Sequence, residues 1–111
     1  MSAARPTTLT VEVDGSPRRL LDPNARPLDA IPVVTPVPLA PDSLAGLAQV
    51  DGEVLPVLWA GTQRSLGIAV LVGSALGRAV LLCGRVVGMS SDAPPLDVHA
   101  LLEALRHEVR G

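Results

Sequence analysis

The sequence predicts a mainly β protein with one helix at its C-terminal end. Eleven prolines and ten glycines interrupt a chain of 111 residues, which is too often for a helical bundle and suits many short strands. Apolar residues make up 48% of the chain but include no Phe, no Tyr and a single Trp. Val, Leu and Ala must therefore fill the core, and small β-branched residues favour strands. We expect a flexible tail at residues 1–7 and one domain at residues 8–111.

The first third of the chain is expected to form three extended segments. Residues 9–14 alternate between apolar and polar side chains, which predicts a half-buried strand. A turn at 15–17 and a second strand at 18–22 follow, and residues 28–34 are the third extended segment. The first strand should have a core side and a solvent side, formed by Leu9, Val11 and Val13 and by Thr10, Glu12 and Asp14, respectively.

The middle of the chain, residues 36–57, has the most specific local signals. Prolines at positions 36, 38 and 41 force an extended path and remove three backbone donors. The pair Asp42-Ser43 then suits the cap of a single helical turn that Gly46 would end.

An Asp-Gly pair in the same stretch predicts a β-hairpin. Gly52 accepts positive φ without steric cost, and the apolar runs 47–50 and 53–59 flank the pair. Pro56 lies inside the second run, which predicts an edge strand or a bulge there. An edge of this kind remains available to a specific partner.

The last third predicts buried strands followed by a helix. The continuous apolar runs 66–72 and 76–83 are typical of strands buried on both faces, and 84–89 is a last strand after a glycine kink. Asp97 suits the N-cap of the C-terminal helix. We expect this helix to dock on its own domain through an apolar stripe: Val98, Leu101, Leu102, Leu105 and Val109. Its opposite face presents His99, Glu103, Arg106 and His107.

The sequence holds no motif for catalysis, cofactor binding or metal binding. It has no Gly-rich phosphate loop, nucleophile elbow or zinc-ligand spacing. His99 and His107 lie about 12 Å apart along a helix, which is too far to share a metal ion. The lone Cys83 lies in an apolar run and is expected to be buried and inert. We therefore expect a protein that is not an enzyme and has no catalytic residue, no cofactor and no metal.

Charge and hydropathy restrict the partners. The net charge is −2 and the nine basic residues, all Arg, form no stripe, which argues against nucleic-acid binding. Residues 65–89 are apolar over a membrane-spanning length, but Arg78 near the centre would cost about 2.5–3.5 kcal/mol on insertion. The N-terminus has no apolar segment of the signal-peptide kind. We expect a cytoplasmic protein without membrane insertion.

Residues 36–57 also resemble a known family. A proline, Ala-Pro, Leu-Ala-Gly, a short strand, a turn glycine and Glu-Val-Leu-Pro-Val follow one another in the order of the central signature of the CheW-like domain. The resemblance is densest there and continues in register over roughly 8–100. It implies two small, intertwined, SH3-like five-stranded β-barrels with one C-terminal α-helix. It also implies a non-enzymatic adaptor of a bacterial chemosensory pathway, located at receptor signalling clusters, that binds the cytoplasmic signalling tip of a chemoreceptor (a methyl-accepting protein).

The chain departs from the family pattern in three places. Asp51 stands where the family usually has an arginine, and Trp59 stands where it usually has an aspartate. The connection at 61–65 is shorter than is typical of the family. Because the family's kinase-binding surface is built partly from such connections, contact with the histidine kinase regulatory domain or with another CheW-like protein stays open.

The resemblance also implies a partner-binding site. In CheW-like adaptors the neighbourhood of the hairpin 46–52 resembles the groove that receives the receptor tip, and Gly46 matches the family motif. Trp59 has two interpretations: it anchors a partner, or it caps a core that has no other aromatic residue. The partner-binding residues that we predict are Leu44, Gly46, Gln49, Asp51, Gly52 and Trp59. The alternative function is a small β-barrel interaction or assembly module unrelated to chemosensing.

Overall fold

Two β-sheets and one helix build the fold. The computed structural model describes residues 7–62 and 67–110, with side chains in these ranges up to residue 105. The first sheet has the strand order β8-β1-β2-β9 and the second the order β3-β6-β7-β5-β4. The strands of the first sheet are β1 Thr8–Val13, β2 Ser16–Leu20, β8 Val86–Ser90 and β9 Pro95–Leu96. Those of the second sheet are β3 Arg26–Pro27, β4 Leu44–Val50, β5 Glu53–Trp59, β6 Ile68–Ser74 and β7 Gly77–Cys83.

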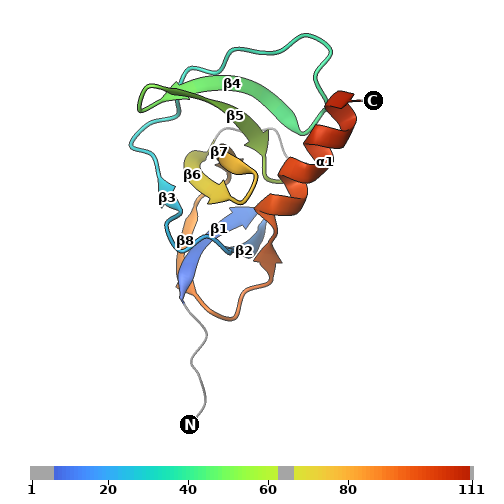
Figure 1. Cartoon of the computed structure of the whole chain (residues 1–111). Helices are drawn as coiled ribbons and strands as arrows, with labels where there is room; N and C mark the ends of the chain where they lie inside the picture. The colour runs from blue at the N-terminus through green and yellow to red at the C-terminus, as the bar shows by residue number, and fades with distance from the viewer. Residues whose placement is uncertain (1–6, 63–66, 111) are drawn as a thin grey trace.

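The predicted mainly β class with a C-terminal helix, α1 Val98–Arg110, is confirmed (Figure 1). The two sheets are intertwined in sequence, because the first takes strands from both sides of the second. They are not closed barrels: one has four strands rather than five, and the outer strands of each sheet are not paired with each other. Two of these outer strands, β3 and β9, are only two residues long, so they offer little backbone for closure.

Strands β6 and β7 provide a wall that both cores share. Their residues alternate between the two faces, and nearly all of those in the middle of each strand are buried. Val70 and Leu81 face a first core cluster with β1 and α1, whereas Leu71 and Val80 face a second cluster with β4 and β5. This double burial explains the continuous apolar runs and confirms the predicted strands for residues 68–83.

Two tight turns have the same backbone geometry. Asp51 and Gly52 have φ angles of 52° and 81°, and Asp14 and Gly15 have 52° and 82°. Positive φ at both central residues is typical of the type I′ turn that joins two twisted antiparallel strands. The predicted Asp-Gly hairpin is therefore confirmed. The first turn comes earlier than predicted, because Ser16 already belongs to β2.

The predicted solvent side of β1 is wrong at Thr10, whereas Glu12 is half-buried and Asp14, in the turn after β1, is exposed. Thr8 and Thr10 are only 3% and 1% exposed, and the Thr10 hydroxyl donates to the carbonyl oxygen of Thr8 at 3.5 Å. The methyl group of threonine suits a covered face that alternation alone predicts as polar, and the Thr10 hydroxyl has a local acceptor. The buried Thr8 Oγ1 has no hydrogen-bond partner among the described residues.

The predicted helical turn at residues 42–45 is also wrong. Leu44 already belongs to β4 and lies opposite Leu58, and the Trp59 amide donates to the Ser43 carbonyl oxygen at 2.9 Å. One local bond is present, from the Leu44 amide to the Pro41 carbonyl oxygen at 3.0 Å, but it closes a single turn at residues 41–44, after which the chain continues as a strand rather than a helix. The extended segment predicted at 28–34 contains no strand residue and follows the two-residue strand β3; Pro32 within it has no amide to donate to a ladder.

Pro56 does not lie on an edge strand, because β5 runs between β4 and β7. Pro56 lies opposite Leu47, whose amide and carbonyl groups are both bonded to Thr35 on the other side. The Pro56 nitrogen therefore faces β7, and the β5–β7 ladder begins one residue later, at Val57. A missing donor is tolerated at that point because no bond is required there.

The helix packs on its own domain, as predicted. Val98, Leu102 and Leu105 are buried in the first core cluster, and Asp97 caps the N-terminus through an Oδ1 that accepts from the Ala100 amide at 3.0 Å. Residues 1–6 of the predicted tail lie outside the described residues, as do the side chains of residues 106–110. Among the described residues, no helix has the length and apolar character needed to cross a membrane.

The Asp97 cap provides a test of this docking. We expect Asp97→Ala to lower the free energy of unfolding by about 1 kcal/mol, because it removes the acceptor for the Ala100 amide. Asp97→Asn keeps an acceptor at the same place and should cost less. Urea denaturation followed by circular dichroism measures both, and equal losses for the two variants would contradict a capping role.

Candidate partner-binding site

The six predicted partner-binding residues all lie on the β4–β5 hairpin or its ends, in two groups. Gln49, Asp51 and Gly52 are exposed at the tip of the hairpin. Leu44, Gly46 and Trp59 lie at its base and are partly or fully buried. Along β4 the distance is roughly 10 Å from Gly46 to Gln49 and more than about 20 Å from Leu44 to Asp51, so the structure does not gather the six residues into one small site.

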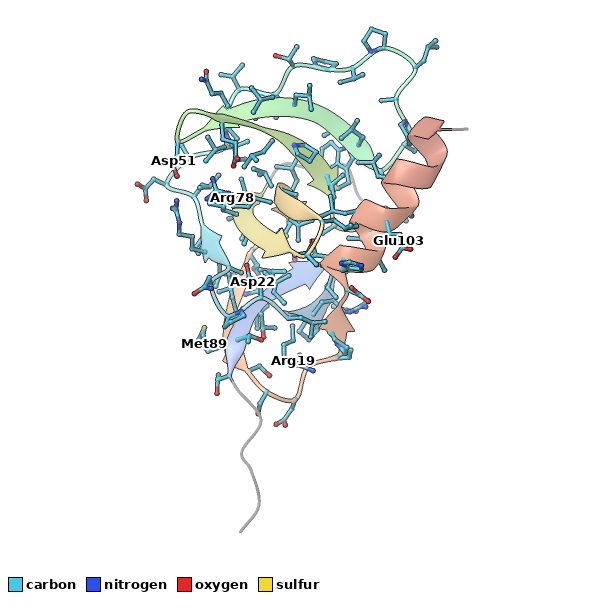
Figure 2. All side chains as sticks on the ribbon, viewed as in Figure 1. Arg19, Asp22, Asp51, Arg78, Met89 and Glu103 are labelled. Atoms are coloured by element: carbon cyan, nitrogen blue, oxygen red, sulfur yellow. The ribbon has the colours of Figure 1, made fainter. Side chains whose placement is uncertain are left out.

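Two ion pairs hold the tip of the hairpin. Arg26 Nη2 of β3 lies 3.1 Å from Asp51 Oδ2, and Arg78 Nη2 of β7 lies 2.9 Å from Glu53 Oε1. The four side chains are between 46% and 63% exposed, so each pair contributes little to stability. Figure 2 shows Asp51 at the outer end of the hairpin, above Arg78. The main consequence of the two ion pairs is that positive and negative side chains alternate on the surface around the turn.

Arg26 and Arg78 were not predicted as part of this site. Each arginine is separated by 25 positions from its carboxylate, and no spacing rule in the sequence links residues that far apart. The register of β3 on β6, with Arg26 opposite Leu71, brings the first pair together. Asp51 itself suits its place, since aspartate tolerates a positive φ better than most residues do.

Gly46 lies beneath another segment of the chain. A Cβ atom at this position would collide with the carbonyl oxygen of Thr35 and with a methyl group of Val34. Thr35 and Leu47 exchange two backbone hydrogen bonds of 2.8 and 2.9 Å directly beside it. Gly46 also has a φ of 154°, which residues with a side chain rarely adopt. Because Gly46 has no side chain, residues 34–35 can pack directly on β4, and Gly46 presents no side chain to a partner.

The base of the hairpin contributes to both cores. Leu44 packs against the first cluster, and Trp59 packs against the second. Of the two interpretations of Trp59, these contacts favour the core cap. Its use as a binding anchor stays a prediction.

The outer face of the hairpin is apolar and was not predicted as such. Leu47 lies opposite Pro56, and Gln49 lies opposite Val54. Leu47 and Val54 are 38% and 63% exposed. In the run Leu-Ala-Gln-Val, the sequence does not tell which apolar residue faces outward, because only the strand register decides it. Exposed apolar side chains next to a charged turn form a surface suited to protein contact.

The described residues supply little reactive chemistry. Cys83 is buried, and desolvation raises the pKa of its thiol to about 12, so it is neutral and unreactive at physiological pH. His99 lies 3.7 Å from the exposed Glu103 carboxylate on the helix surface. Within residues 7–62 and 67–105, no group of three His, Cys, Asp or Glu side chains is placed to hold a metal ion. The side chain of His107 lies outside the described residues.

Comparison with known proteins identifies a fold. No family model and no curated protein matches the chain. Among solved structures, it is similar to the scaffolding protein TtCheW from Thermoanaerobacter tengcongensis, with a TM-score of 0.63 and 14% sequence identity. The match covers 81% of this chain and 67% of TtCheW. At this identity, the likeness shows that the chain has a CheW-like fold.

The two glycines of the hairpin, Gly46 in β4 and Gly52 in the turn, should respond differently to alanine. Gly46→Ala should lower the free energy of unfolding by about 3 kcal/mol, because the new methyl group displaces residues 34–35. Gly52→Ala should cost only about 1 kcal/mol, because nothing lies within 4 Å of its Cβ position and only its φ is strained. Urea unfolding of both variants checks the order, and a larger loss for Gly52→Ala would contradict the covered position of Gly46.

The buried thiol gives a pH prediction. The pKa of Cys83 is about 12 in the folded protein, against an ordinary value of 9.0. The contribution of the neutral Cys83 thiol to the free energy of unfolding is complete below pH 9. It is lost as the pH rises toward 12, because the thiol ionises at a lower pH in the unfolded chain than in the folded protein. At pH 8 a disulfide reagent should label the native protein at least about a hundredfold more slowly than the urea-unfolded protein. Equal labelling rates would show that the thiol is accessible.

Proposed function

We propose that this protein is a non-enzymatic CheW-like adaptor that binds the cytoplasmic tip of a chemoreceptor within a bacterial chemosensory complex. The observation that carries the proposal is that one stretch, residues 36–57, resembles the family signature and contains most of the β4–β5 hairpin, whose tip is exposed, in a CheW-like fold. The proposal assigns no catalytic residue, cofactor or metal, and it places the protein at receptor clusters in the cytoplasm.

The tip of the hairpin supports a receptor contact of altered charge. The family arginine is replaced by Asp51, yet a guanidinium remains in this region because Arg26 lies 3.1 Å from the Asp51 carboxylate. We infer that Arg26 supplies the cation and Asp51 adds an anion beside it. Charges at the rim of an interface change partner choice and association rate more than they change the fold. A receptor tip made acidic opposite Asp51 should therefore bind poorly.

A reduced kinase contact is part of the proposal. It rests on the short 61–65 connection, of which only Gly61 and Thr62 are described, and on the changed charge at Asp51. The protein would then receive the receptor tip without joining it directly to the kinase. Its size and short connection are similar to those of FrzB, the small CheW-like protein of the frizzy motility system.

Surface plasmon resonance against two immobilised partners tests this function. A helical-hairpin peptide of a receptor signalling tip should bind the protein, whereas a kinase regulatory domain should bind at least about tenfold more weakly. Binding to neither partner would favour an interaction module outside chemosensing. Equal binding to both would contradict the reduced adaptor.

A charge-reversal variant locates the contact. Asp51→Arg places a second cation beside Arg26 and should weaken receptor-tip binding about tenfold, mainly through the association rate, with a smaller effect at high salt. Glu103→Arg is the matched control, since Glu103 is similarly exposed and lies on the helix, well away from the hairpin tip (Figure 2). Equal losses for the two variants would place the contact elsewhere or indicate a general charge effect.

A further inference from the structure

The edge strand β8 differs from the other strands at sheet edges. The edge strands β3 and β9 are two residues long and each contains a proline, and β4 is bridged on its outer side by Thr35. Prolines, charges and covering segments are the usual protection of a sheet edge. Strand β8, with the sequence Val-Val-Gly-Met-Ser, has no proline and no charged residue, and no described segment pairs with its outer side.

The backbone of β8 is oriented to accept another strand. Glu12 of β1 exchanges bonds with Arg85 and Gly84 at 2.8 and 2.9 Å, so alternate residues of β1, including Thr10, also point toward β8. Thr10 lies opposite Gly88, which directs the amide and carbonyl of Gly88 toward β1. The Val87 carbonyl and both backbone groups of Met89 therefore point away from the sheet. The bulge at Val86–Val87 leaves residues 88–90 in regular register.

The side chains of β8 are apolar and exposed. Val86, Val87 and Met89 are 38%, 47% and 63% exposed, and Figure 2 shows Met89 on the outer margin of the ribbon. Met89 lies opposite Leu9, which belongs to the first core cluster. Since opposite residues share a face of the sheet, a strand added beside β8 would continue this apolar row.

We propose that β8 is a homodimer interface, in which the β8 strands of two copies pair antiparallel about a two-fold axis at Gly88. In this register Val87 lies opposite Met89 of the second copy, so the outward Met89 amide donates to the outward Val87 carbonyl, and the symmetry axis repeats the bond. Gly88 meets its own equivalent at a non-hydrogen-bonded position, where two Cα atoms approach within about 4.5 Å. No atom lies within 4 Å of a Cβ at Gly88, so nothing covers that face of the sheet at the axis.

The charges near β8 favour a second copy of this chain as the molecule that pairs with its edge. Arg85 precedes β8; its side chain is 68% exposed and lies 3.2 Å from the Glu12 carboxylate of its own chain, and the exposed Asp92 follows β8. Antiparallel pairing brings Asp92 of one copy near this Arg85–Glu12 pair of the other at both ends of the interface, where the guanidinium can contact both carboxylates. The net charge of −2 adds little repulsion between two copies. A sequence that is complementary to itself across a two-fold axis forms an isologous, closed contact.

Analytical ultracentrifugation of the full chain, from low micromolar to submillimolar concentration, tests the proposal. The wild-type protein should shift from monomer to dimer, and Met89→Lys should raise the dimer dissociation constant at least about tenfold, because it replaces an apolar contact with a charge. Val33→Lys is the control, since Val33 is 88% exposed and lies outside both sheets, in the segment between β3 and β4. It should leave the dissociation constant unchanged.

Hydrogen exchange of the wild-type protein provides a second test that needs no variant. The Met89 amide should exchange more slowly as the concentration rises, whereas the Gly88 amide, bonded to β1, should be protected throughout. A protein that stays monomeric, or a dimer that Met89→Lys leaves intact and whose Met89 amide is never protected, would overturn the proposal. Because neither test uses receptor or kinase, its failure would leave the adaptor function untouched.

Discussion

Burial of β6 and β7 on both faces is the constraint on which the rest of the fold depends. Val70 and Leu81 close one core against β1 and the helix, while Leu71 and Val80 close the other against the β4–β5 hairpin. Trp59 is the single aromatic residue of the chain, so aliphatic side chains, many of them from β6 and β7, fill both cores. A polar residue in the middle of either strand would therefore disrupt the core that its side chain faces.

The elements predicted correctly are those whose signal is local. The Asp51-Gly52 turn requires positive φ at both positions, the Asp97 cap requires an acceptor, and the apolar runs around Leu71 and Leu81 require burial on both faces. The failures have a common physical reason. Thr10, Ser43 and Pro56 owe their environments to partners distant in sequence, which propensity and periodicity do not encode.

The candidate site shows the same division. Sequence placed Gly46, Asp51 and Gly52 on a hairpin, but it gave no indication that residues 34–35 cover Gly46 or that Arg26 pairs with Asp51. It also missed the outward direction of Val54, because only the register of β4 on β5 fixes that face. Residues that are adjacent in one sequence motif thus have different roles in the structure. Those at the tip of the hairpin are exposed to solvent, and those at its base pack in the cores.

The first sheet combines strands from the two ends of the chain, and this affects how the protein folds during translation. Strands β1 and β2 lie near one end of the chain, whereas their neighbours β8 and β9 lie near the other. During translation, residues 8–20 must wait until residues 86–96 leave the ribosome, while β4 to β7 assemble among themselves. Such distant pairing is slow, because the intervening loop must close first. The β1–β2 hairpin therefore lacks both of its strand neighbours until residues 86–96 have been made, and until then it can pack only on β6 and β7.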